Sequence, residues 1–494
     1  MRLSDLTETT AGALKSASAA LSDLMTPTVR LGVTGLARSG KTVFITTLVR
    51  SLLAGGRLPF FSAMAEGRIT RAYLEPQPDD AVPRFAYEEH LGLLAKAPPE
   101  WPESTRRLSQ LRLTIEYTSK LALRRTLGPG RLHVDIVDYP GEWLIDLPLL
   151  EMSFPDWSRQ AVEDARAPHR RQAAAPWLEL ISTLDPEALE DEQIALTGAE
   201  AFTRYLLAAR ALDPALSAPG PGRFLLPGDL AGSPLLTFFP LPPAGGSASP
   251  RGSLGAMLAR RFESYKAHVV KPFFRDHFAR LDRQIVLMDA LSAVNAGASA
   301  LADLQRTMEA VLECFRPGAN TWLSSILARR IDRLLFAATK ADHLHHSSHD
   351  RLEAILRLLA EQAIARASFA GAEVKVMALA ALRATREAEA RSGRQTLPCI
   401  VGVPLPGERL GRKVFDGVAE AAVFPGDLPE DAASLLVPPA GAIAPGEDSA
   451  DASVHFPRFR PPRVSLEAPS GEAPALPHIR LDRAIEFLLG DRLA

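Results

Sequence analysis

Gly35-Leu-Ala-Arg-Ser-Gly-Lys-Thr42 is the stretch of sequence that decides the fold. It follows an alternating apolar segment at 29–33, which has the period of a strand. It precedes Phe44, Leu48 and Leu52, which recur every four residues as they would on a helix face. A glycine-rich turn between a strand and a helix, ending in Gly-Lys-Thr, is the phosphate-loop pattern. The pattern predicts backbone N–H groups that surround a phosphate chain at the helix N-terminus.

Each residue type in this loop has a role in that chemistry. Lys41 is expected to contact the β and γ phosphates, and the Thr42 hydroxyl is expected to coordinate Mg²⁺. An ordinary glycine-rich turn is the alternative interpretation, but the strand before and the helix after favour the phosphate loop. The residues expected to bind the phosphates of a nucleotide are Arg38, Ser39, Gly40, Lys41, Thr42 and Val43.

Four further strand patterns follow along the chain, and helical patterns separate them. These strands are expected at 132–138, 284–289, 333–339 and 374–379. Alternating strands and helices imply a mostly parallel sheet with helices on its faces, and such sheets bind ligands at the carboxyl ends of their strands. We therefore predict an α/β fold: a P-loop NTPase core of the Ras-like GTPase kind, enlarged by helical and by irregular or β insertions.

Asp138-Tyr-Pro-Gly141 ends the second expected strand. In GTPases a carboxylate with this spacing holds Mg²⁺ through water, and the glycine N–H contacts the γ-phosphate. Asp135 lies three residues earlier and faces the opposite side of the strand, so we assign Asp138 to the metal and Asp135 to structure. A plain exit from strand to turn is the alternative interpretation.

Thr339-Lys-Ala-Asp342 follows the fourth expected strand. Guanine presents two donors, N1–H and N2–H₂, and one carboxylate accepts both, so Asp342 is expected to select guanine over adenine. The stem of Lys340 is expected to lie over the base, and the ring of His343 to cover the base edge. Thr339 stands where Asn is usual. Four such residues are a weak signal alone, but they follow two other motifs in the correct order.

Together these motifs resemble the YcjX-like family of P-loop GTPases, which are stress-associated bacterial proteins. The resemblance implies guanine-nucleotide binding, slow hydrolysis and a candidate partner, a YcjF-like inner-membrane protein. It covers nearly the whole chain and rests on Gly35–Thr42, Trp101-Pro102 with Ser104-Thr105-Arg106, Asp138-Tyr-Pro-Gly-Glu-Trp143, Thr339-Lys-Ala-Asp-His343, Leu382-Arg-Ala-Thr385 and His478-Ile-Arg-Leu-Asp482.

Trp101, Ser104, Thr105 and Arg106 lie between the phosphate loop and Asp138, where the switch I loop belongs. The resemblance suggests that this segment reaches the γ-phosphate and binds nucleotide. Arg106 is then a candidate cis arginine finger, a group that stabilises transition-state charge. The alternative is that Arg106 is a solvated cation at a helix start.

Two positions near the site depart from the usual pattern. The guanine-contacting loop after the fifth strand commonly carries a serine, but here it is Ala380-Ala381-Leu382. Backbone N–H groups, including those of Ala381 and Arg383, are therefore expected to bind the guanine O6. Glu142 stands where a Gln usually orients the attacking water, and a carboxylate is repelled by the γ-phosphate. We expect Glu142 to point away, with hydrolysis slow or dependent on a partner.

Four histidines, at 343, 345, 346 and 349, include a pair spaced by four residues. Such a set is a candidate metal site, but no Cys or carboxylate set closes it. Apart from His343, we interpret them as part of a solvated loop and helix start.

The 494 residues include 56 Lys and Arg against 58 Asp and Glu, a formal net charge of −2. This balance argues against a protein that coats DNA or RNA, because that affinity comes from excess cations, and we expect no nucleic-acid partner. Cys314 and Cys399 have no metal-ligand spacing and fit a reducing compartment. No apolar run reaches about 18 residues. We expect a cytoplasmic protein, with any attachment at the inner membrane peripheral.

The spacing of the motifs predicts insertions. Lys41 and Asp138 are 97 positions apart, and Asp138 and Asp342 are 204 apart, whereas a βαβ unit needs only about 30. The expected parts are an N-terminal helix (1–27), a GTPase core (28–56, 131–149 and 280–390), a switch-containing insertion (57–130), a helical insertion with a Pro/Gly-rich linker (150–279), an irregular or β addition (391–476) and a terminal helix (477–494).

These observations predict an enzyme, a GTPase. It would bind guanine nucleotide, hydrolyse GTP to GDP slowly with Mg²⁺ and act as a molecular switch, and the resemblance adds a stress response. Two alternatives stay open. One is a nucleotide-stabilised scaffold with negligible turnover. The other is an ATPase, which Asp342 disfavours.

Overall fold

The computed structural model describes residues 26–36, 38–121, 128–212, 220–242, 249–313, 331–392, 395–437, 455–466 and 475–494. The helix expected at 1–27 lies almost entirely outside the described residues, and so does Cys314.

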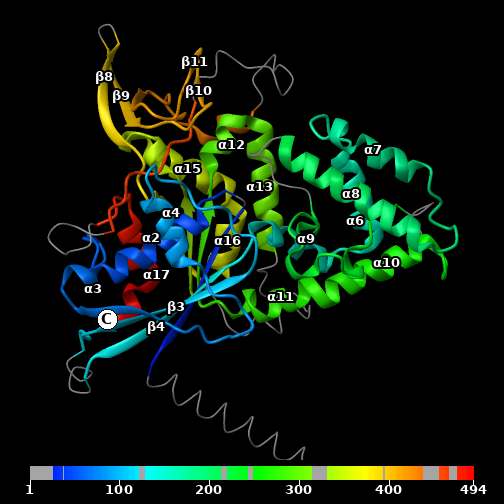
Figure 1. Ribbon diagram of the computed structural model, residues 1–494, viewed down its shortest axis with the longest axis horizontal. Helices are drawn as coiled ribbons and strands as arrows, with labels where there is room; N and C mark the ends of the chain where they lie inside the picture. The colour runs from blue at the N-terminus through cyan, green and yellow to red at the C-terminus, as the bar shows by residue number, and fades with distance from the viewer. Residues whose placement is uncertain are drawn as a thin grey trace, which may run out of the picture.

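A seven-stranded sheet forms the centre of the molecule, in the order β2-β3-β4-β1-β5-β6-β7 (Figure 1). The strands β4, β1, β5, β6 and β7 run parallel to one another, and β3 is antiparallel to both of its neighbours. The prediction of a mostly parallel α/β sheet is therefore confirmed. The strands are β1 (Thr28–Gly35), β2 (Ile69–Glu75), β3 (Ser109–Tyr117), β4 (Gly130–Asp138), β5 (Arg283–Met288), β6 (Arg333–Ala338) and β7 (Glu373–Ala378).

Strands β2 and β3 lie within 57–130, a segment that the sequence analysis assigns to an insertion. Both pair into the central sheet, so this segment builds part of the core. The signal for β3 is visible afterwards, because Leu111, Leu113 and Ile115 alternate with polar residues and are fully buried. The proline clusters that flank these strands hide the pattern.

Helices cover both faces of the sheet. Alternate residues of β5 point to opposite sides: Ile285 and Leu287 pack with one set of helices, and Val286 and Met288 pack with the other. The first set is α2 (Lys41–Leu53), α4 (Tyr87–Ala95) and α17 (Leu481–Leu489). The second set is α12 (Ala290–Ala296), α13 (Ala298–Glu313), α15 (His349–Leu359) and α16 (Glu361–Phe369).

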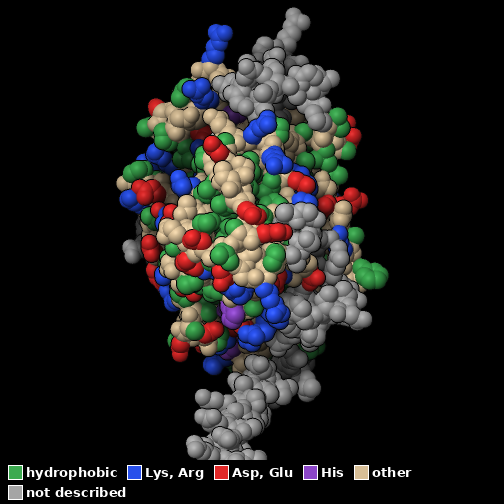
Figure 2. All heavy atoms as spheres, turned by 90° about the vertical axis from the view of Figure 1, so that its right-hand side faces the viewer, with side chains coloured by type: hydrophobic (Ala, Val, Ile, Leu, Met, Phe, Trp, Pro, Cys, Tyr) green, Lys and Arg blue, Asp and Glu red, His purple; other side chains and the backbone are tan. Residues whose placement is uncertain are grey.

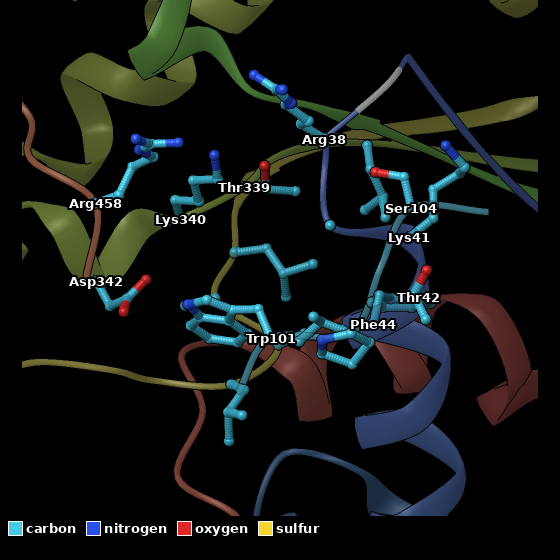
Figure 3. Close-up of a pocket in the computed structure, with 18 of the residues that line it drawn as sticks. Arg38, Lys41, Thr42, Phe44, Trp101, Ser104, Thr339, Lys340, Asp342 and Arg458 are labelled. Atoms are coloured by element: carbon cyan, nitrogen blue, oxygen red, sulfur yellow. The ribbon is translucent and has the colours of Figure 1, made fainter. Parts of the chain in front are cut away.

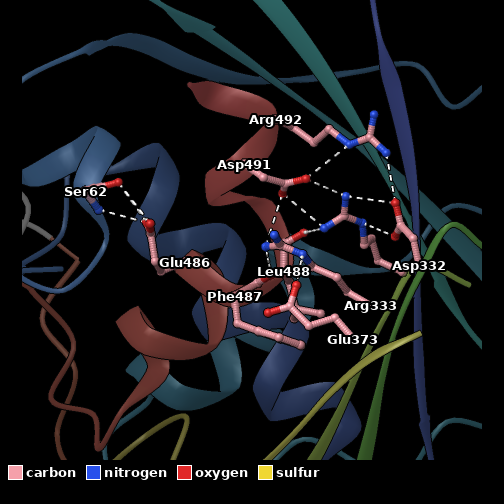
Figure 4. A network of polar contacts seen from close by, with 10 residues as sticks. Ser62, Asp332, Arg333, Glu373, Glu486, Phe487, Leu488, Asp491 and Arg492 are labelled. Carbon is pink, nitrogen blue, oxygen red and sulfur yellow. Dashed lines mark hydrogen bonds and ion pairs between the residues drawn. The ribbon is translucent and has the colours of Figure 1, made fainter. Parts of the chain in front are cut away.

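Helix α17 returns to the core through polar contacts as well as apolar ones (Figure 4). Glu486 accepts hydrogen bonds from the backbone N and the hydroxyl of Ser62, at 2.9 and 3.0 Å, on α3 (Ser62–Ala65). Asp491, in the 3₁₀ turn after α17, pairs with Arg283 and Arg333 at the start of β5 and β6. Glu486 thus ties α17 to α3, and Asp491 ties the turn after α17 to the ends of the sheet strands at which β5 and β6 begin.

A helical lobe projects from one side of the sheet (Figure 1, right). Its centre is aromatic: the rings of Trp157 and Phe262 stack at 4.9 Å, and those of Trp177 and Tyr205 at 5.3 Å. The lobe consists of the 3₁₀ helix η1 (Gly141–Glu151), α6 (Phe154–Ala165), α7 (Arg171–Ser182), α8 (Glu192–Leu212), α9 (Gly222–Leu225), α10 (Leu254–Tyr265), the π-helix η5 (Lys266–Val270) and α11 (Lys271–Asp276).

The outer face of this lobe carries both signs of charge. Figure 2 shows acidic and basic side chains interspersed there, with hydrophobic side chains between them. Among these elements, Leu207 of α8 is 47% exposed, and Leu189 before α8 is 85% exposed.

A small β unit follows β7 in the chain (Figure 1, top). Its apolar residues, among them Ile400, Val423 and Phe459, form a cluster of their own. The first strand begins at Arg386, before the boundary at 391 that the sequence analysis expects. The strands are β8 (Arg386–Ser392), β9 (Gln395–Gly402), β10 (Arg409–Leu410), β11 (Lys413–Val414) and β12 (Ala421–Val423).

Within the part of the chain that the structure describes, we find no helix with the length and apolar character needed to cross a bilayer.

Candidate functional site

The loop at 35–42 joins the end of β1 to the start of α2. Gly40 precedes the helix with a φ of 89°, a left-handed conformation that glycine adopts without strain. Lys41 is 6% exposed, and its Nζ donates to the carbonyl oxygen of Gly35 at 2.9 Å. Burial lowers the pKa of Lys41, although nearby carboxylates, Asp138 first, oppose this. The loop thus places an ammonium group at a helix N-terminus, an arrangement that suits a phosphate.

Three oxygen-bearing side chains meet at the first turn of α2, those of Thr42, Thr105 and Asp138. The Thr105 hydroxyl donates to Asp138 Oδ2 at 2.7 Å and lies 3.4 Å from the Thr42 hydroxyl. Asp138 is buried, and its Oδ1 has no hydrogen-bond partner among the described residues. Burial raises the pKa of Asp138 to about 6, against the opposing effect of Lys41. A buried carboxylate oxygen without a partner, close to two hydroxyls, fits a hard divalent cation such as Mg²⁺.

The Thr339–Asp342 motif begins directly after β6. Lys340 has a φ of 60°, and its Nζ forms an ion pair with Asp289 at the end of β5. Burial alone would raise the pKa of Asp289, but Lys340 and the hydrogen bonds with Ser292 hold it below its usual value. Asp342 is 4% exposed, and its Oδ2 accepts a hydrogen bond from the backbone N of Ala384 at 2.8 Å. The two side chains are therefore fixed by neighbours at strand ends.

A pocket of about 290 Å³ connects these two groups of residues. Figure 3 shows Lys41 and Thr42 at one end, Lys340 and Asp342 at the other, and the indole of Trp101 between them. The pocket brings together most of the predicted nucleotide-binding residues. Those that line it are Arg38, Gly40, Lys41, Thr42, Val43, Trp101, Ser104, Thr105, Lys340, Asp342, His343 and Ala381.

The other predicted residues do not line this pocket. Ser39 is buried within the loop itself. Gly141 packs behind the loop so closely that a Cβ there would lie 2.2 Å from the carbonyl oxygen of Gly35. The side chain of Arg383 turns to the backbone, and its Nε donates to the carbonyl oxygen of Thr385 at 2.9 Å. The close approach of residue 141 to the carbonyl oxygen of Gly35 therefore requires glycine at 141.

The two predicted catalytic residues other than Lys41 contact other parts of the chain. Arg106 does not line the pocket; its side chain is 74% exposed and pairs at 2.8 Å with Glu103, which does line it. Glu142 is 3% exposed, and its Oε1 accepts from Arg210 Nη2 at 2.5 Å. Arg210 lies in the last turn of α8. The carboxylate of Glu142 is thus held by the helical lobe.

The segment that follows Asp138 is embedded in this lobe. A Cβ on Gly222 would lie 1.9 Å from the carbonyl oxygen of Glu142. Asp146 accepts from the backbone N of Gly222 at 2.6 Å and from the hydroxyl of Tyr265 at 2.7 Å. Sequence reasoning did not find Arg210, Gly222 or Tyr265, because no local pattern links them to Glu142.

The small β unit contributes a further wall that the sequence analysis missed. The residues are Leu405, Arg458 and Phe459. The indole N–H of Trp101 donates to the carbonyl oxygen of Phe459 at 2.7 Å, and the rings of His343 and Phe459 meet edge to face at 5.2 Å. Arg458 and Phe459 lie in a Pro/Gly-rich segment, where no motif marks them.

The interpretation of the histidines after Asp342 as solvated is wrong for His349. This residue is 3% exposed, and its Nε2 lies 2.9 Å from the carbonyl oxygen of Ala341. His343 is buried too, and burial lowers its pKa.

Comparison with known proteins places this geometry in a family. A family model described as "YcjX-like family, DUF463" matches residues 29–493. The Escherichia coli (strain K12) protein named "Ras-like GTPase YcjX" is 38% identical over 476 residues, which cover 94% of this chain and 96% of that protein. The protein of the same name from Shewanella oneidensis is 34% identical over 483 residues, 94% of each chain. A P-loop core of the Ras-like GTPase kind agrees with these names and with the sheet. The chain belongs to the YcjX-like family.

Proposed function

We propose that this chain binds GTP and hydrolyses it slowly to GDP with Mg²⁺, as a molecular switch. One observation carries the proposal: a single pocket holds Lys41 and Thr42 at one end and Asp342 at the other. The relatives named Ras-like GTPase support the identity of the nucleotide.

At the base end, the carboxylate of Asp342 would accept hydrogen bonds from N1–H and N2–H₂ of guanine. The stem of Lys340, held by Asp289, would lie over the base, and the backbone N–H of Ala381 would donate to O6. The backbone N–H of Arg383, expected from the sequence to do the same, instead donates to the carbonyl oxygen of Pro477 at 2.8 Å. The rings of Trp101 and His343 line the same pocket. Adenine lacks the donor pair, so Asp342 would discriminate against it.

At the phosphate end, Lys41 would place its ammonium group on the β and γ phosphates in place of its contact with the Gly35 carbonyl. The groups that would hold Mg²⁺ are the hydroxyl of Thr42 and the carboxylate of Asp138. When bound, the ion neutralises negative charge on the phosphates. Thr105, which donates to Asp138, keeps that carboxylate oriented.

For hydrolysis, we assign Arg106 to stabilise charge at the γ-phosphate, whereas Glu142 would have to leave Arg210 before it could orient water. The Arg106 role requires its side chain to leave Glu103 when nucleotide binds. In a single-turnover assay, the rate of Arg106→Ala should then fall at least about tenfold, with exposed Arg107→Ala as the matched control. An unchanged rate in Arg106→Ala would remove the arginine-finger role.

The nucleotide and the reaction are tested separately. In competition binding, GDP should displace labelled GDP far better than ADP does, and equal affinity would remove the guanine assignment. Purified protein should release phosphate from GTP, and Lys41→Ala should abolish the release. Lys96→Ala, which removes an exposed lysine paired with Glu100, is the control for Lys41→Ala.

A nucleotide-stabilised scaffold with negligible turnover is the second candidate. The contact between Glu142 and Arg210 favours it, because it engages the group that would orient water. Tight GDP binding without any Lys41-dependent phosphate release would select the scaffold. The stress response and a YcjF-like partner come from the family resemblance alone and stay predictions.

A further inference from the structure

Two histidines and a glutamate meet at the surface beside the base end of the pocket. His345 and His346 follow the motif that ends in Asp342, and Glu387 lies on β8. Their ligand atoms all lie within 4.8 Å of one another. Nδ1 of His346 is 2.7 Å from Glu387 Oε2, and Nε2 of His345 is 3.7 Å from the same oxygen. The fold supplies the carboxylate that the sequence around these histidines lacks.

This set of atoms suits a borderline transition-metal ion. Zn²⁺ binds imidazole nitrogen and carboxylate oxygen, and with three protein ligands it takes water in the fourth position. The side chain of His346 is 68% exposed, which gives the ion a path in and leaves room for that water. Mg²⁺ prefers oxygen ligands in octahedral geometry. The set therefore differs in chemistry from the oxygen atoms of Thr42 and Asp138.

Neighbouring side chains orient these ligands. Nδ1 of His345 lies 2.9 Å from the Ser347 hydroxyl, which leaves Nε2 facing Glu387. Arg383 Nη2 lies 3.5 Å from Oε1 of Glu387, the oxygen that does not face the histidines. Oε2 is therefore available to a metal ion while Oε1 keeps its cation. Outer contacts of this kind hold metal ligands in position.

We propose that His345, His346 and Glu387 form a binding site for Zn²⁺ or a similar transition-metal ion. The ion would join the segment after β6 to the β8–β9 hairpin. GTP hydrolysis as proposed above needs no such ion, so the site adds a second metal to the molecule.

Metal binding has a consequence for the base end. His345 follows Asp342 by three residues, and Glu387 follows Ala384 by three, and the backbone N of Ala384 donates to Asp342. An ion that joins 345 to 387 would brace the two loops around the base, so GDP should dissociate more slowly when Zn²⁺ is bound. This consequence rests on the proposed function, whereas metal binding itself does not.

The test uses the full chain without an affinity tag, stripped of nucleotide and metal. Zn²⁺ binding is measured by calorimetry, and Co²⁺ binding by visible absorption. The double variant His345→Ala/His346→Ala and the single variant Glu387→Gln should each weaken Zn²⁺ binding at least about tenfold. His268→Ala, which removes an exposed histidine from the helical lobe, should leave the affinity unchanged. Excess Mg²⁺ should not compete.

A loss of less than tenfold in the double variant, with circular dichroism showing an intact fold, would overturn the site. Glu387→Gln tests the same site with less risk of misfolding, because the substitution keeps the side-chain shape and removes only the charge. If Zn²⁺ binds but leaves GDP dissociation unchanged, the bracing is wrong and the site stands. A protein that binds Zn²⁺ and no GDP would contradict the proposed function alone.

Discussion

The two ends of the pocket are held by different parts of the molecule. At the base end, Lys340 pairs with Asp289, and Asp342 is fixed by Ala384, so every partner comes from a strand end of the core or just beyond it. At the phosphate end, the hydroxyl of Thr42 is 3.4 Å from that of Thr105, and the Arg106 side chain is 74% exposed.

The same end depends on the helical lobe through the contact between Glu142 and Arg210. The two motif side chains that would recognise the base are thus held by the core, and the small β unit adds a wall through Phe459. The γ-phosphate side is completed by segments that lie between the core strands. Changes in those segments should therefore affect the response to the γ-phosphate more than they affect base recognition.

The largest expected effect is at the base end. Asp342→Asn keeps the shape and one acceptor oxygen, but it exchanges a charged acceptor for an amide. GDP affinity should fall about 10- to 100-fold, since hydrogen bonds to charged groups contribute about 1.5–3 kcal/mol each. XDP, with an oxygen in place of the guanine amino group, should gain affinity because the amide can donate to it. Calorimetry with both nucleotides measures the loss of GDP affinity and the gain of XDP affinity. Equal losses of affinity for both nucleotides would contradict base recognition by Asp342.

The next effect is a pH dependence at the phosphate end. Burial raises the pKa of Asp138 from 3.8 to about 6, so its carboxyl is mostly protonated at pH 5. The Mg²⁺ needed to retain bound nucleotide should therefore rise about tenfold from pH 7 to pH 5. The stability of the metal-free fold should change with pH in the opposite direction. The folded state holds the proton of Asp138 more tightly than the unfolded state does, so this group stabilises the metal-free fold at low pH. That contribution is lost as pH rises through 6.

Retention of a fluorescent GDP analogue at varied Mg²⁺ checks this effect, with Mg²⁺ binding to free GDP as the reference at each pH. A requirement for Mg²⁺ that stays constant between pH 7 and pH 5 would show that Asp138 is not the metal group.

The smallest expected effect is at the contact between the helical lobe and Glu142. A change there should alter hydrolysis and leave binding at the base end nearly unchanged. Arg210→Ala removes the partner of a buried carboxylate, so we expect hydrolysis to change about three- to tenfold while GDP affinity changes less than about threefold. Combining it with Glu142→Gln should cancel most of the change, because the buried charge is then gone. Arg204→Ala on the same helix is the control. Additive effects of the two substitutions on the hydrolysis rate would show that the pair does not act as a unit.

Local patterns at strand ends were enough to predict the parallel strands of the core and the motifs that follow them. The 35–42 loop and Asp342 follow strands whose ends the parallel sheet brings to one pocket, and Asp138, the last residue of β4, contacts Thr105 in the lining of that pocket. The strands β2 and β3 were missed because proline clusters surround them.

The contacts that complete the site could not be predicted in this way, since they join distant segments. Glu142 and Arg210 are 68 positions apart, Trp101 and Phe459 are 358 apart, and His346 and Glu387 are 41 apart. Each contact depends on how an insertion packs, and packing across such separations leaves no periodic signal in the sequence.

The loop after β7 pairs with the segment just before α17. Ala380 and Ile479 exchange two backbone hydrogen bonds, and the backbone N of Arg383 donates to the carbonyl oxygen of Pro477. Residues 477–479 leave the ribosome after the loop at 35–42 and after every strand of the central sheet. A growing chain can therefore complete the loop for the base only once this later segment has been made, so selectivity for a nucleotide has to follow the synthesis of the sheet.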